Sequence, residues 1–301
     1  MKKILLFTED DWAFGSLHHG LEKELYKNGI YSNVLDWRNL YTLDEIAYLV
    51  DHYDYFVTSP GELMILINYG VPLEKVVTIA HAAWDIFRAS SLDIPIATEH
   101  YSKLHNYAVI NPELQYVAKY SGCAKEVKLV KNGIHFDYLY NQPPSQLSKV
   151  GYAATMETVN FFQQKIKRGH LVEKAAQISG LEFKPTVKSK FLCVPGYYKT
   201  IDCVVQSSTE EACGLPMLEA AAAGRLCIGT PRGYFKHNAD NGGGIKVRLD
   251  EDGFVADVVE TLEYYKANPE KYKQKCLDIQ EYARYNYDWK YVIDDWIELF
   301  N

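Results

Sequence analysis

The sequence predicts an α/β protein built from two doubly wound parallel-sheet domains, and three observations support this prediction. The chain has 301 residues, which suits two domains of about 150 residues each. Short apolar runs alternate with segments of helical periodicity along most of the chain. The polar segment YLYNQPPSQLS at 138–148 contains Pro143 and Pro144 side by side, and it is the best candidate for a linker between the domains.

The first half alternates strands and helices as expected of βαβ units. The apolar run KILLFT at 3–8 predicts a buried opening strand. Leucines that recur every four residues predict a helix over 15–27, and Asn28 followed by Gly29 predicts its end. The other elements predicted for this half are strands at 31–35, 55–58, 76–80, 95–98, 107–110 and 127–130, and helices at 63–69 and 112–120.

The second half repeats the alternation from Lys149 onward. It predicts strands at 150–154, 202–206 and 226–229, helices at 169–179 and 216–223, a glycine-rich loop at 241–244, and helices to the end. Ligands of doubly wound sheets bind at the carboxyl ends of the strands. We therefore expect a cleft between the carboxyl ends of the two sheets.

Composition narrows the class of protein. The net charge is −7 and the pI about 5.7, so no general basic field draws the chain onto nucleic acid or an anionic membrane. No apolar stretch approaches the roughly 20 residues of a membrane span, and the apolar run at the N-terminus is too short for a signal peptide. The six cysteines form no CxxC pair. We expect a soluble, cytoplasmic protein without a transmembrane segment, and its oligomeric state stays open.

The chemically densest stretch is SSTEEACGLPMLEAAAAG at 207–224. Pro216 suits the first turn of a helix, and Gly224 suits its end. Gly214 lets backbone come close to a ligand. The amide end of such a helix is a ready site for an anion.

Two glutamates, Glu211 in the loop and Glu219 in the first helical turn, are eight residues apart. Both can face a ligand in one crevice, where carboxylates accept hydrogen bonds from sugar hydroxyls. The alternative is that Glu211 is a solvated loop charge and that Glu219 only complements the helix dipole.

The stretch EACGLPMLEAAAAG at 211–224 closely resembles the E-x7-E motif of retaining GT-B glycosyltransferases of the GT4 type, also called group 1. Three further stretches resemble the same family: YKTIDCVVQSS at 198–208, LVKNGIHF at 129–136 and ARYNYDWKYVIDDWIELF at 283–300. The resemblance implies the GT-B fold, with two Rossmann-like domains facing a cleft. It places an acceptor-side domain at 1–143, a helix at about 284–301 that crosses back onto it, and a nucleotide-sugar-binding domain at 144–283.

The resemblance also implies roles for single residues. Glu219 matches the glutamate that holds the ribose hydroxyls of the donor, and Glu211 matches the one near the donor sugar. Cys213, Gly214 and Leu215 match the turn whose backbone amides meet the sugar and the phosphates. Retention in this family is usually explained by front-face attack in which the diphosphate leaving group assists the acceptor.

One basic residue of the family is missing. The expected diphosphate-binding arginine falls near Thr155, whereas a basic cluster of Lys165, Lys167 and Arg168 stands just before Gly169. Stabilising the leaving diphosphate is the largest catalytic effect that we expect. We predict that Lys167 or Arg168 supplies the surviving clamp and that Lys165 contacts the donor. The alternative is a solvated helix start.

The first domain contributes candidates on two loops. His81 follows a predicted strand and resembles a histidine near the donor sugar in several GT4-type enzymes, although packing in the core is the alternative. In the first loop, Gly15 allows close approach of the donor, while Asp11, Trp12 and His18 are candidates for acceptor contacts. The spacing of the acidic and histidine residues there is not diagnostic of a metal site, so we expect neither a metal nor a cofactor.

The prediction is therefore a retaining, metal-independent hexosyl- or pentosyltransferase. It moves a sugar from a nucleotide-sugar, with a UDP-sugar favoured, to a glycan, lipid-linked or small-molecule acceptor. One alternative is a phage-type glycosyltransferase that modifies a hydroxymethylated DNA base, because the chain is short for this group. Another is a non-catalytic nucleotide-sugar-binding module, which the threonine at position 155 would favour.

Overall fold

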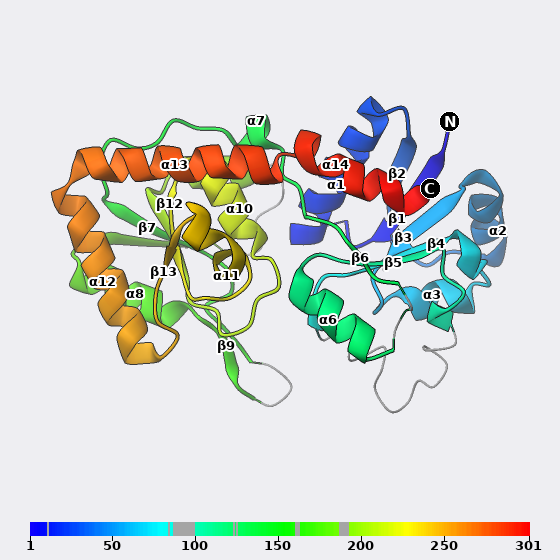
Figure 1. Cartoon of the computed structure of the whole chain (residues 1–301), viewed down its shortest axis with the longest axis horizontal. Coiled ribbons are helices and arrows are strands. Elements are labelled where there is room, and N and C mark those ends of the chain that lie inside the picture. Colours follow the sequence, from blue (N-terminus) through cyan, green and yellow to red (C-terminus); the bar gives the residue numbers. More distant parts are fainter. Residues whose placement is uncertain are drawn as a thin grey trace. The chain divides into compact units, whose positions relative to one another are not determined.

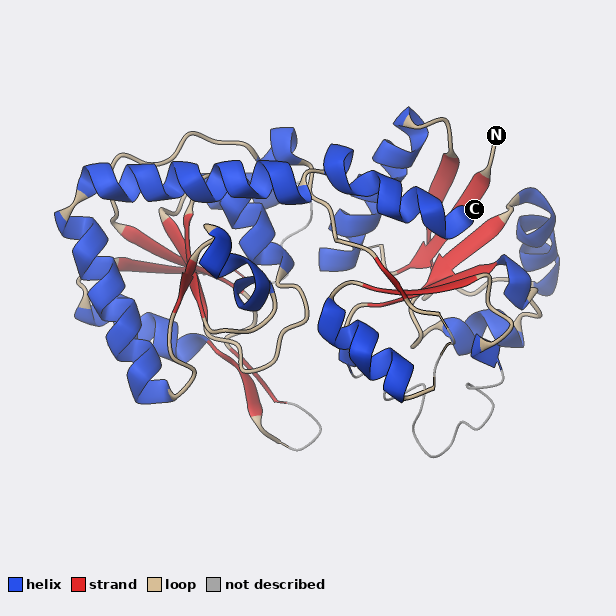
Figure 2. Ribbon diagram, in the orientation of Figure 1, coloured by secondary structure: helices blue, strands red, loops and turns tan. Residues whose placement is uncertain are grey.

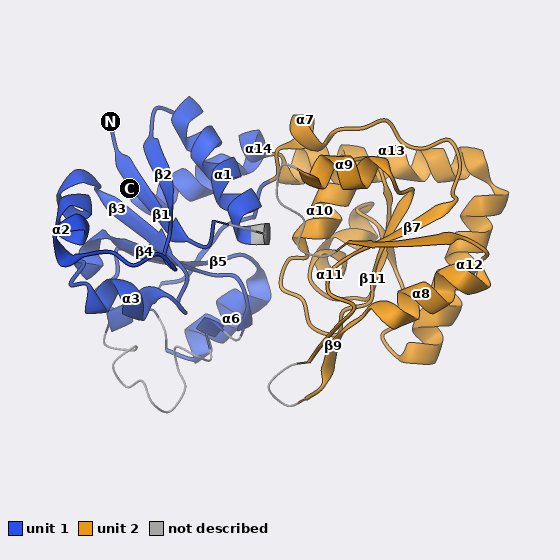
Figure 3. Ribbon diagram, turned by 180° about the vertical axis from the view of Figure 1, so that it is seen from behind, with its two compact units in different colours: residues 1–133, 289–301 blue, residues 134–288 orange. Residues whose placement is uncertain are grey.

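The computed structural model describes residues 1–10, 12–83, 85–86, 100–122, 124, 126–159, 163–186 and 193–301. The chain divides into two compact units, which Figure 3 distinguishes by colour. Unit 1 comprises Met1–Gly133 and Trp289–Asn301, and unit 2 comprises Ile134–Asp288. The strand predicted at 95–98 lies outside the described residues.

Unit 1 is a six-stranded parallel sheet in the order β2-β1-β3-β4-β5-β6. Its strands are β1 (Lys3–Thr8), β2 (Tyr31–Asp36), β3 (Tyr55–Thr58), β4 (Val76–Ala80), β5 (Asn106–Val109) and β6 (Lys128–Leu129). Its helices are α1 (Trp12–Lys27), α2 (Leu43–His52), α3 (Leu63–Asn68), α6 (Pro112–Tyr120) and α14 (Trp289–Ile297), with short 3₁₀ turns at Leu73–Lys75 and Glu298–Phe300. Helices α1 and α14 lie on one face of the sheet, and α3 and α6 lie on the other (Figures 1 and 2).

Local sequence explains these elements. The predicted leucines of α1 (Leu17, Leu21 and Leu25) are buried against the sheet, and Gly29 ends the helix with a φ of 74°. Helix α2 begins with a capping box, in which Thr42 Oγ1 accepts from Glu45 N at 3.2 Å and Glu45 Oε2 accepts from Thr42 N at 2.8 Å.

Two glycines allow the last helix to pack in unit 1. A Cβ on Gly20 would lie 2.4 Å from Trp289 Nε1, and one on Gly133 would lie 2.3 Å from Trp289 Cδ2. Two turns further along α14, Trp296 is held by a hydrogen bond from its Nε1 to Lys131 O at 2.7 Å. The indole of Trp289 therefore fills a space that only glycine backbone leaves open.

Unit 2 contains a five-stranded parallel sheet in the order β10-β7-β11-β12-β13 and a two-stranded antiparallel ribbon. The sheet strands are β7 (Lys149–Ala153), β10 (Glu182–Thr186), β11 (Cys203–Gln206), β12 (Leu226–Gly229) and β13 (Ile245–Lys246), and the ribbon pairs β8 (Glu157–Val159) with β9 (Lys165–Arg168). The helices are α7 (Phe136–Leu139), α8 (Gly169–Ile178), α9 (Val194–Lys199), α10 (Leu215–Ala222), α11 (Tyr234–Asn238), α12 (Glu251–Ala267) and α13 (Pro269–Tyr287), with a 3₁₀ turn at Ala239–Asn241. Helices α10 and α13 cover one face of the sheet, and α8 and α12 cover the other (Figure 1).

The two parallel sheets confirm the predicted fold class. The segment 138–148, predicted as a linker, packs within unit 2 instead: Leu139 and Leu147 are buried, and Gln280 Nε2 donates to Asn141 O at 2.8 Å. The units accordingly divide after residues 133 and 288, whereas the sequence suggested divisions near 143 and 283. In the described part of the chain, no helix is long and apolar enough to cross a membrane.

Candidate functional site

The site in unit 2 is built on the loop that follows β11. Ser207 and Ser208 leave the strand fully buried, and the loop then turns into α10 through Gly214. Gly214 has a φ of 78°, and a Cβ there would lie 2.8 Å from Gln206 Oε1. The left-handed backbone conformation therefore favours glycine, and the turn places the amide end of α10 directly after the loop.

Lys167 and Glu211 meet in this loop. Lys167 Nζ forms an ion pair with Glu211 Oε2 and donates to Ser208 Oγ at 3.0 Å. The side chains of Lys167 and Glu211 are only 22% and 20% exposed, so solvent screens their attraction less than at an open surface. The sequence predicted Lys167 or Arg168 as the diphosphate clamp and Lys165 as a donor contact, and Lys167 is the one of the three whose side chain pairs with Glu211.

The ribbon β8–β9 explains this placement. Thr209 N donates to Ile166 O at 3.0 Å, and Thr209 Oγ1 donates to Lys165 O at 3.0 Å, so the loop after β11 is bonded along β9. The interpretation of this cluster as a solvated helix start holds only in part, because Lys165 and Lys167 lie on strand β9, while Arg168 ends that strand as the N-cap of α8 and is buried.

The other two cations have different surroundings. Arg168 is 4% exposed, and its guanidinium donates to Ser207 O at 2.8 Å and to Leu249 O at 2.9 Å, while its Nη2 is buried without a hydrogen-bond partner. Arg168 therefore fixes the start of the loop after β11 through its hydrogen bond to Ser207 O. Lys165 is exposed and pairs with Glu157 across the ribbon at 2.6 Å, which raises the pKa of Lys165.

Gly233 is in close contact with the Glu211 side chain. Its φ is 52°, and a Cβ would lie 2.7 Å from Glu211 Cγ and 3.1 Å from Cys213 O. The next residue, Tyr234, donates its backbone N–H to Cys213 O at 2.8 Å. Glu211 is thus positioned by a glycine contact as well as by its ion pair.

Glu219 lies in α10, in its second turn and not in the first as predicted, because the helix already begins at Leu215. Its residue is 7% exposed, and its Oε2 accepts from the hydroxyl of Tyr198 at 3.0 Å. The interpretation of Glu219 as a residue of the first turn that complements the helix dipole loses its basis.

Thr155, where the family's arginine is expected, belongs to the start of the ribbon. Its backbone carbonyl accepts from the hydroxyl of Tyr152 at 3.1 Å, and its Oγ1 lies 2.5 Å from Thr158 Oγ1. Thr155 therefore offers a hydroxyl group, but no positive charge, at the position of the family's arginine.

In unit 1, His81 follows β4 at the carboxyl edge of the sheet. Its ring lies edge-on to Phe14, with centroids 5.1 Å apart, and 6.2 Å from the ring of His18. Asp85 fixes the turn, because its Oδ2 accepts from His81 N at 3.0 Å and from Ala82 N at 3.1 Å. Burial lowers the pKa of His81 to about 3 and that of His18 to about 4, so both imidazoles are neutral at physiological pH.

The residues predicted for the first loop of unit 1 have mixed outcomes. His18 is buried, with its Nδ1 2.9 Å from Phe14 O, so its ring packs in the unit. Gly15 and His18 lie in α1 and not in the loop before it, and a Cβ on Gly15 would lie 2.9 Å from the backbone carbonyl of Asp10. Asp11 lies outside the described residues, and Trp12 begins α1 with a side chain outside them.

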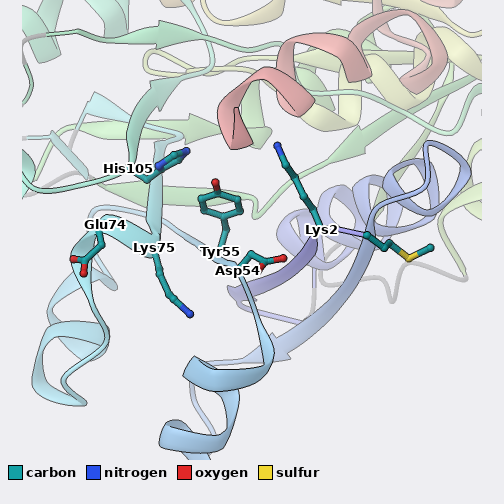
Figure 4. A pocket seen from close by; sticks show the side chains of 7 residues that line it. Lys2, Asp54, Tyr55, Glu74, Lys75 and His105 are labelled. Carbon is teal, nitrogen blue, oxygen red and sulfur yellow. The ribbon is translucent and has the colours of Figure 1, made fainter.

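An open hollow lies at the amino ends of the unit 1 strands (Figure 4). It encloses about 510 Å³ and is lined by Met1, Lys2, Asp54, Tyr55, Glu74, Lys75 and His105. Both of its lysines are already bonded: Lys2 Nζ donates to Phe300 O at 2.6 Å, and Lys75 Nζ donates to Val50 O at 2.6 Å. This edge of the sheet is opposite to the one at which ligands of such sheets bind.

Residues 153–264 match the family described as glycosyl transferases group 1. The matched segment contains the ribbon, the Glu211 loop and all of α10. The matched segment lies wholly within unit 2. No curated protein sequence matches the chain.

Solved structures resemble the whole chain. Anabaena HepE in complex with UDP and glucose has a TM-score of 0.70 and 14% identity, with 99% of each chain covered. Sucrose-phosphate synthase from Thermosynechococcus elongatus has a TM-score of 0.69 and 12% identity, covering 100% of this chain and 98% of that one. The catalytic domain of Arabidopsis thaliana Starch Synthase IV, bound to ADP and acarbose, has a TM-score of 0.69 and 12% identity, covering 99% and 98%. These likenesses establish the GT-B fold.

Three residues that shape the site in this GT-B fold were not predicted as site residues: Ser208, Gly233 and Tyr198. Ser208 stands next to the motif, so a buried serine after an apolar strand was a usable signal. Gly233 contacts Glu211 and Tyr198 contacts Glu219 only in the folded chain, because both lie far from these glutamates in the sequence. Among the described residues, no group of three or more His, Cys, Asp or Glu side chains is arranged to hold a metal ion.

Proposed function

We propose that the chain is a retaining glycosyltransferase of the GT4 type, which binds a nucleotide-sugar in unit 2 and transfers its sugar to a glycan, lipid-linked or small-molecule acceptor. The observation that carries this proposal is the Lys167–Ser208–Glu211 cluster beside the amide end of α10. An ammonium group and a helix N-terminus together suit a diphosphate, and an adjacent carboxylate suits sugar hydroxyls.

Lys167 is the cation proposed to face the diphosphate. Without ligand its charge is compensated by Glu211. Donor binding would exchange that partner for phosphate oxygens, which frees the Glu211 carboxylate to accept hydrogen bonds from the sugar. Glu219, matched to the ribose position of the family, and the turn of Cys213, Gly214 and Leu215 complete the proposed donor contacts.

The proposed stereochemistry is retention. Glu211 is held by a cation and a serine, an arrangement that suits hydrogen bonding to the sugar better than it suits a carboxylate nucleophile. In front-face attack, the bond from the anomeric carbon to the diphosphate breaks while the acceptor oxygen bonds on the same face. The acceptor proton passes to the departing phosphate oxygen, whose charge Lys167 stabilises.

His81 is proposed to act as an uncharged group near the sugar. Its low pKa keeps the imidazole neutral, so it offers a hydrogen bond and not a positive charge. The same proposal includes metal independence, because Lys167 supplies the positive charge that a divalent ion supplies in other enzymes. Activity in the presence of EDTA tests this point.

The choice of donor follows from similar folds. The structure of HepE contains UDP and glucose, and that of Starch Synthase IV contains ADP and acarbose. Both support a nucleoside diphosphate at the proposed site, and UDP-glucose is the first donor to test.

The proposal is tested by thermal unfolding with UDP-, ADP-, GDP- and CMP-sugars, with Glu219→Ala beside the wild type. A ligand that binds only the folded state raises the melting temperature in a concentration-dependent way. We expect one donor to do so, its effect to be lost in Glu219→Ala, and the wild type to hydrolyse or transfer its sugar. Binding without turnover would identify a non-catalytic module instead, and no binding would refute the proposal. Proton NMR of the anomeric product distinguishes retention from inversion.

A further inference from the structure

The hydroxyl of Tyr198 donates a hydrogen bond to the carboxylate of Glu219. The side chain comes from α9 and is 1% exposed. Its hydroxyl lies 3.0 Å from Glu219 Oε2 and 3.0 Å from the backbone carbonyl of Pro216. Tyr198 therefore touches both the carboxylate and the first turn of the helix that carries it.

The direction of this hydrogen bond is fixed by chemistry. Burial, together with the charge of Glu219, raises the pKa of Tyr198 well above its usual value. The phenol thus keeps its single hydrogen and is the donor toward both acceptors, Glu219 Oε2 and Pro216 O, between which this hydrogen is shared. A hydrogen bond to a charged acceptor is among the stronger ones in proteins. The Glu219 carboxylate is consequently oriented by Tyr198 before any ligand arrives.

We propose that Tyr198 is a positioning residue for donor binding, which holds the Glu219 carboxylate in the orientation that accepts the ribose hydroxyls of the nucleotide. The inference rests on the proposed function, in which Glu219 contacts the ribose. It assigns to α9 a role in nucleotide affinity, although Tyr198 itself does not touch the nucleotide.

The matched control is the neighbouring tyrosine. Tyr197 is also in α9, is partly buried, and donates its hydroxyl to Lys184 O at 2.8 Å, away from Glu219. Each of Tyr198→Phe and Tyr197→Phe removes one hydroxyl and keeps the ring, so both variants should fold. Circular dichroism and the melting temperature verify this.

The experiment is isothermal titration with UDP, ADP and GDP, followed by titration with the 2′,3′-dideoxy form of the nucleotide that binds best. We expect Tyr198→Phe to weaken binding of the ribonucleotide about tenfold, as for loss of a hydrogen bond to a charged group, and Tyr197→Phe to change it less than about twofold. For the dideoxy nucleotide, the wild type and Tyr198→Phe should bind alike, because the hydroxyls that Glu219 accepts are gone.

A double-mutant cycle completes the test. If Tyr198 acts through Glu219, Tyr198→Phe should have no further effect on nucleotide affinity in the Glu219→Ala background. Equal losses for ribo- and dideoxynucleotide, or additive losses in the cycle, would show a merely structural role and overturn the inference while leaving the proposed function intact. If the wild type binds no nucleotide, the proposed function fails and the inference fails with it.

Discussion

The carboxyl edge of the unit 1 sheet and that of the unit 2 sheet carry opposite chemistry on the same architecture. After β4, the rings of His81, His18 and Phe14 pack together and both histidines are neutral. After β11, a lysine and a glutamate form a partly shielded ion pair beside a helix N-terminus. The carboxyl ends of parallel strands meet at one edge of the sheet in either unit. Of these two described clusters, the one after β11 offers a positive charge to an anion. The difference supports the proposal that the diphosphate binds in unit 2.

The largest expected effect on activity is the loss of the Glu211 carboxylate. Glu211→Ala should lower kcat roughly 100- to 1,000-fold, because it removes a charged group held at the proposed reacting sugar. The matched control is Glu210→Ala, which removes the adjacent but exposed carboxylate and should change kcat less than about twofold. Initial rates with the active nucleotide-sugar measure both. Equal rates for the two variants would remove Glu211 from the site.

The contact of Gly233 with Glu211 gives the next largest effect. In Gly233→Ala, the new Cβ would collide with Glu211 Cγ, so Glu211 must shift and activity should fall about 10- to 100-fold. Gly242→Ala is the control, because Gly242 also has a positive φ, of 101°, but a Cβ there would meet nothing within 4 Å. Gly233→Ala should also lose more stability than Gly242→Ala, because Gly233 has a ψ of −123° and lies outside the left-handed helical region that Gly242 occupies, so activity is measured at a temperature at which both variants are folded. Equal losses of activity in the two variants would mean that backbone strain, and not a displaced Glu211, causes the loss.

The buried, uncharged His18 of unit 1 should make the stability of the protein depend on pH. Because the pKa of His18 is lower in the folded state, about 4, than its unfolded value of about 6.5, its contribution is fully present above pH 6.5 and is lost as the pH falls toward 4. The loss from His18 is roughly 2 kcal/mol at pH 5. Urea unfolding of the wild type and His18→Gln at pH 7.5 and pH 5 measures it, and the variant should show the smaller difference between the two conditions.

The adjacent histidine supplies a control of opposite sign. Hydrogen bonds to Glu22 and Asp10 raise the pKa of His19, so its contribution is present below pH 6.5 and is lost as the pH rises through the folded value. His19→Gln should therefore lose more stability at pH 5 than at pH 7.5. If the stability loss in His18→Gln and that in His19→Gln change with pH in the same direction, the opposite pKa shifts of the two histidines are contradicted.

The fold was largely predictable because its signals are local. Buried strands such as β12 and helices such as α6 match the predicted bounds, since an apolar run or an Asn-Pro start defines them without tertiary information. The ribbon β8–β9 was missed because KIKR has no apolar alternation. Its strand character comes from pairing with β8 and from the Thr209 hydrogen bonds.

The site was predictable only where the motif is contiguous. Glu211, Gly214 and Glu219 could be singled out because they lie within one segment of nine residues. The sequence could not separate Lys167 from Arg168, since neighbours on a strand face opposite sides and the pairing register decides which faces the loop. Nor could it find Tyr198, which is 21 residues from Glu219 in sequence.

The most direct test of the central claim compares Lys167 with Lys165, two lysines of one strand of which only Lys167 faces the Glu211 loop. Isothermal titration with UDP, and with ADP and GDP, should show micromolar to millimolar binding to the wild type. Lys167→Ala should weaken that binding at least about tenfold, because a charge-assisted contact to phosphate is lost, and Lys165→Ala should leave it nearly unchanged. Equal affinity in Lys167→Ala and the wild type would contradict the assignment of Lys167 as the diphosphate clamp.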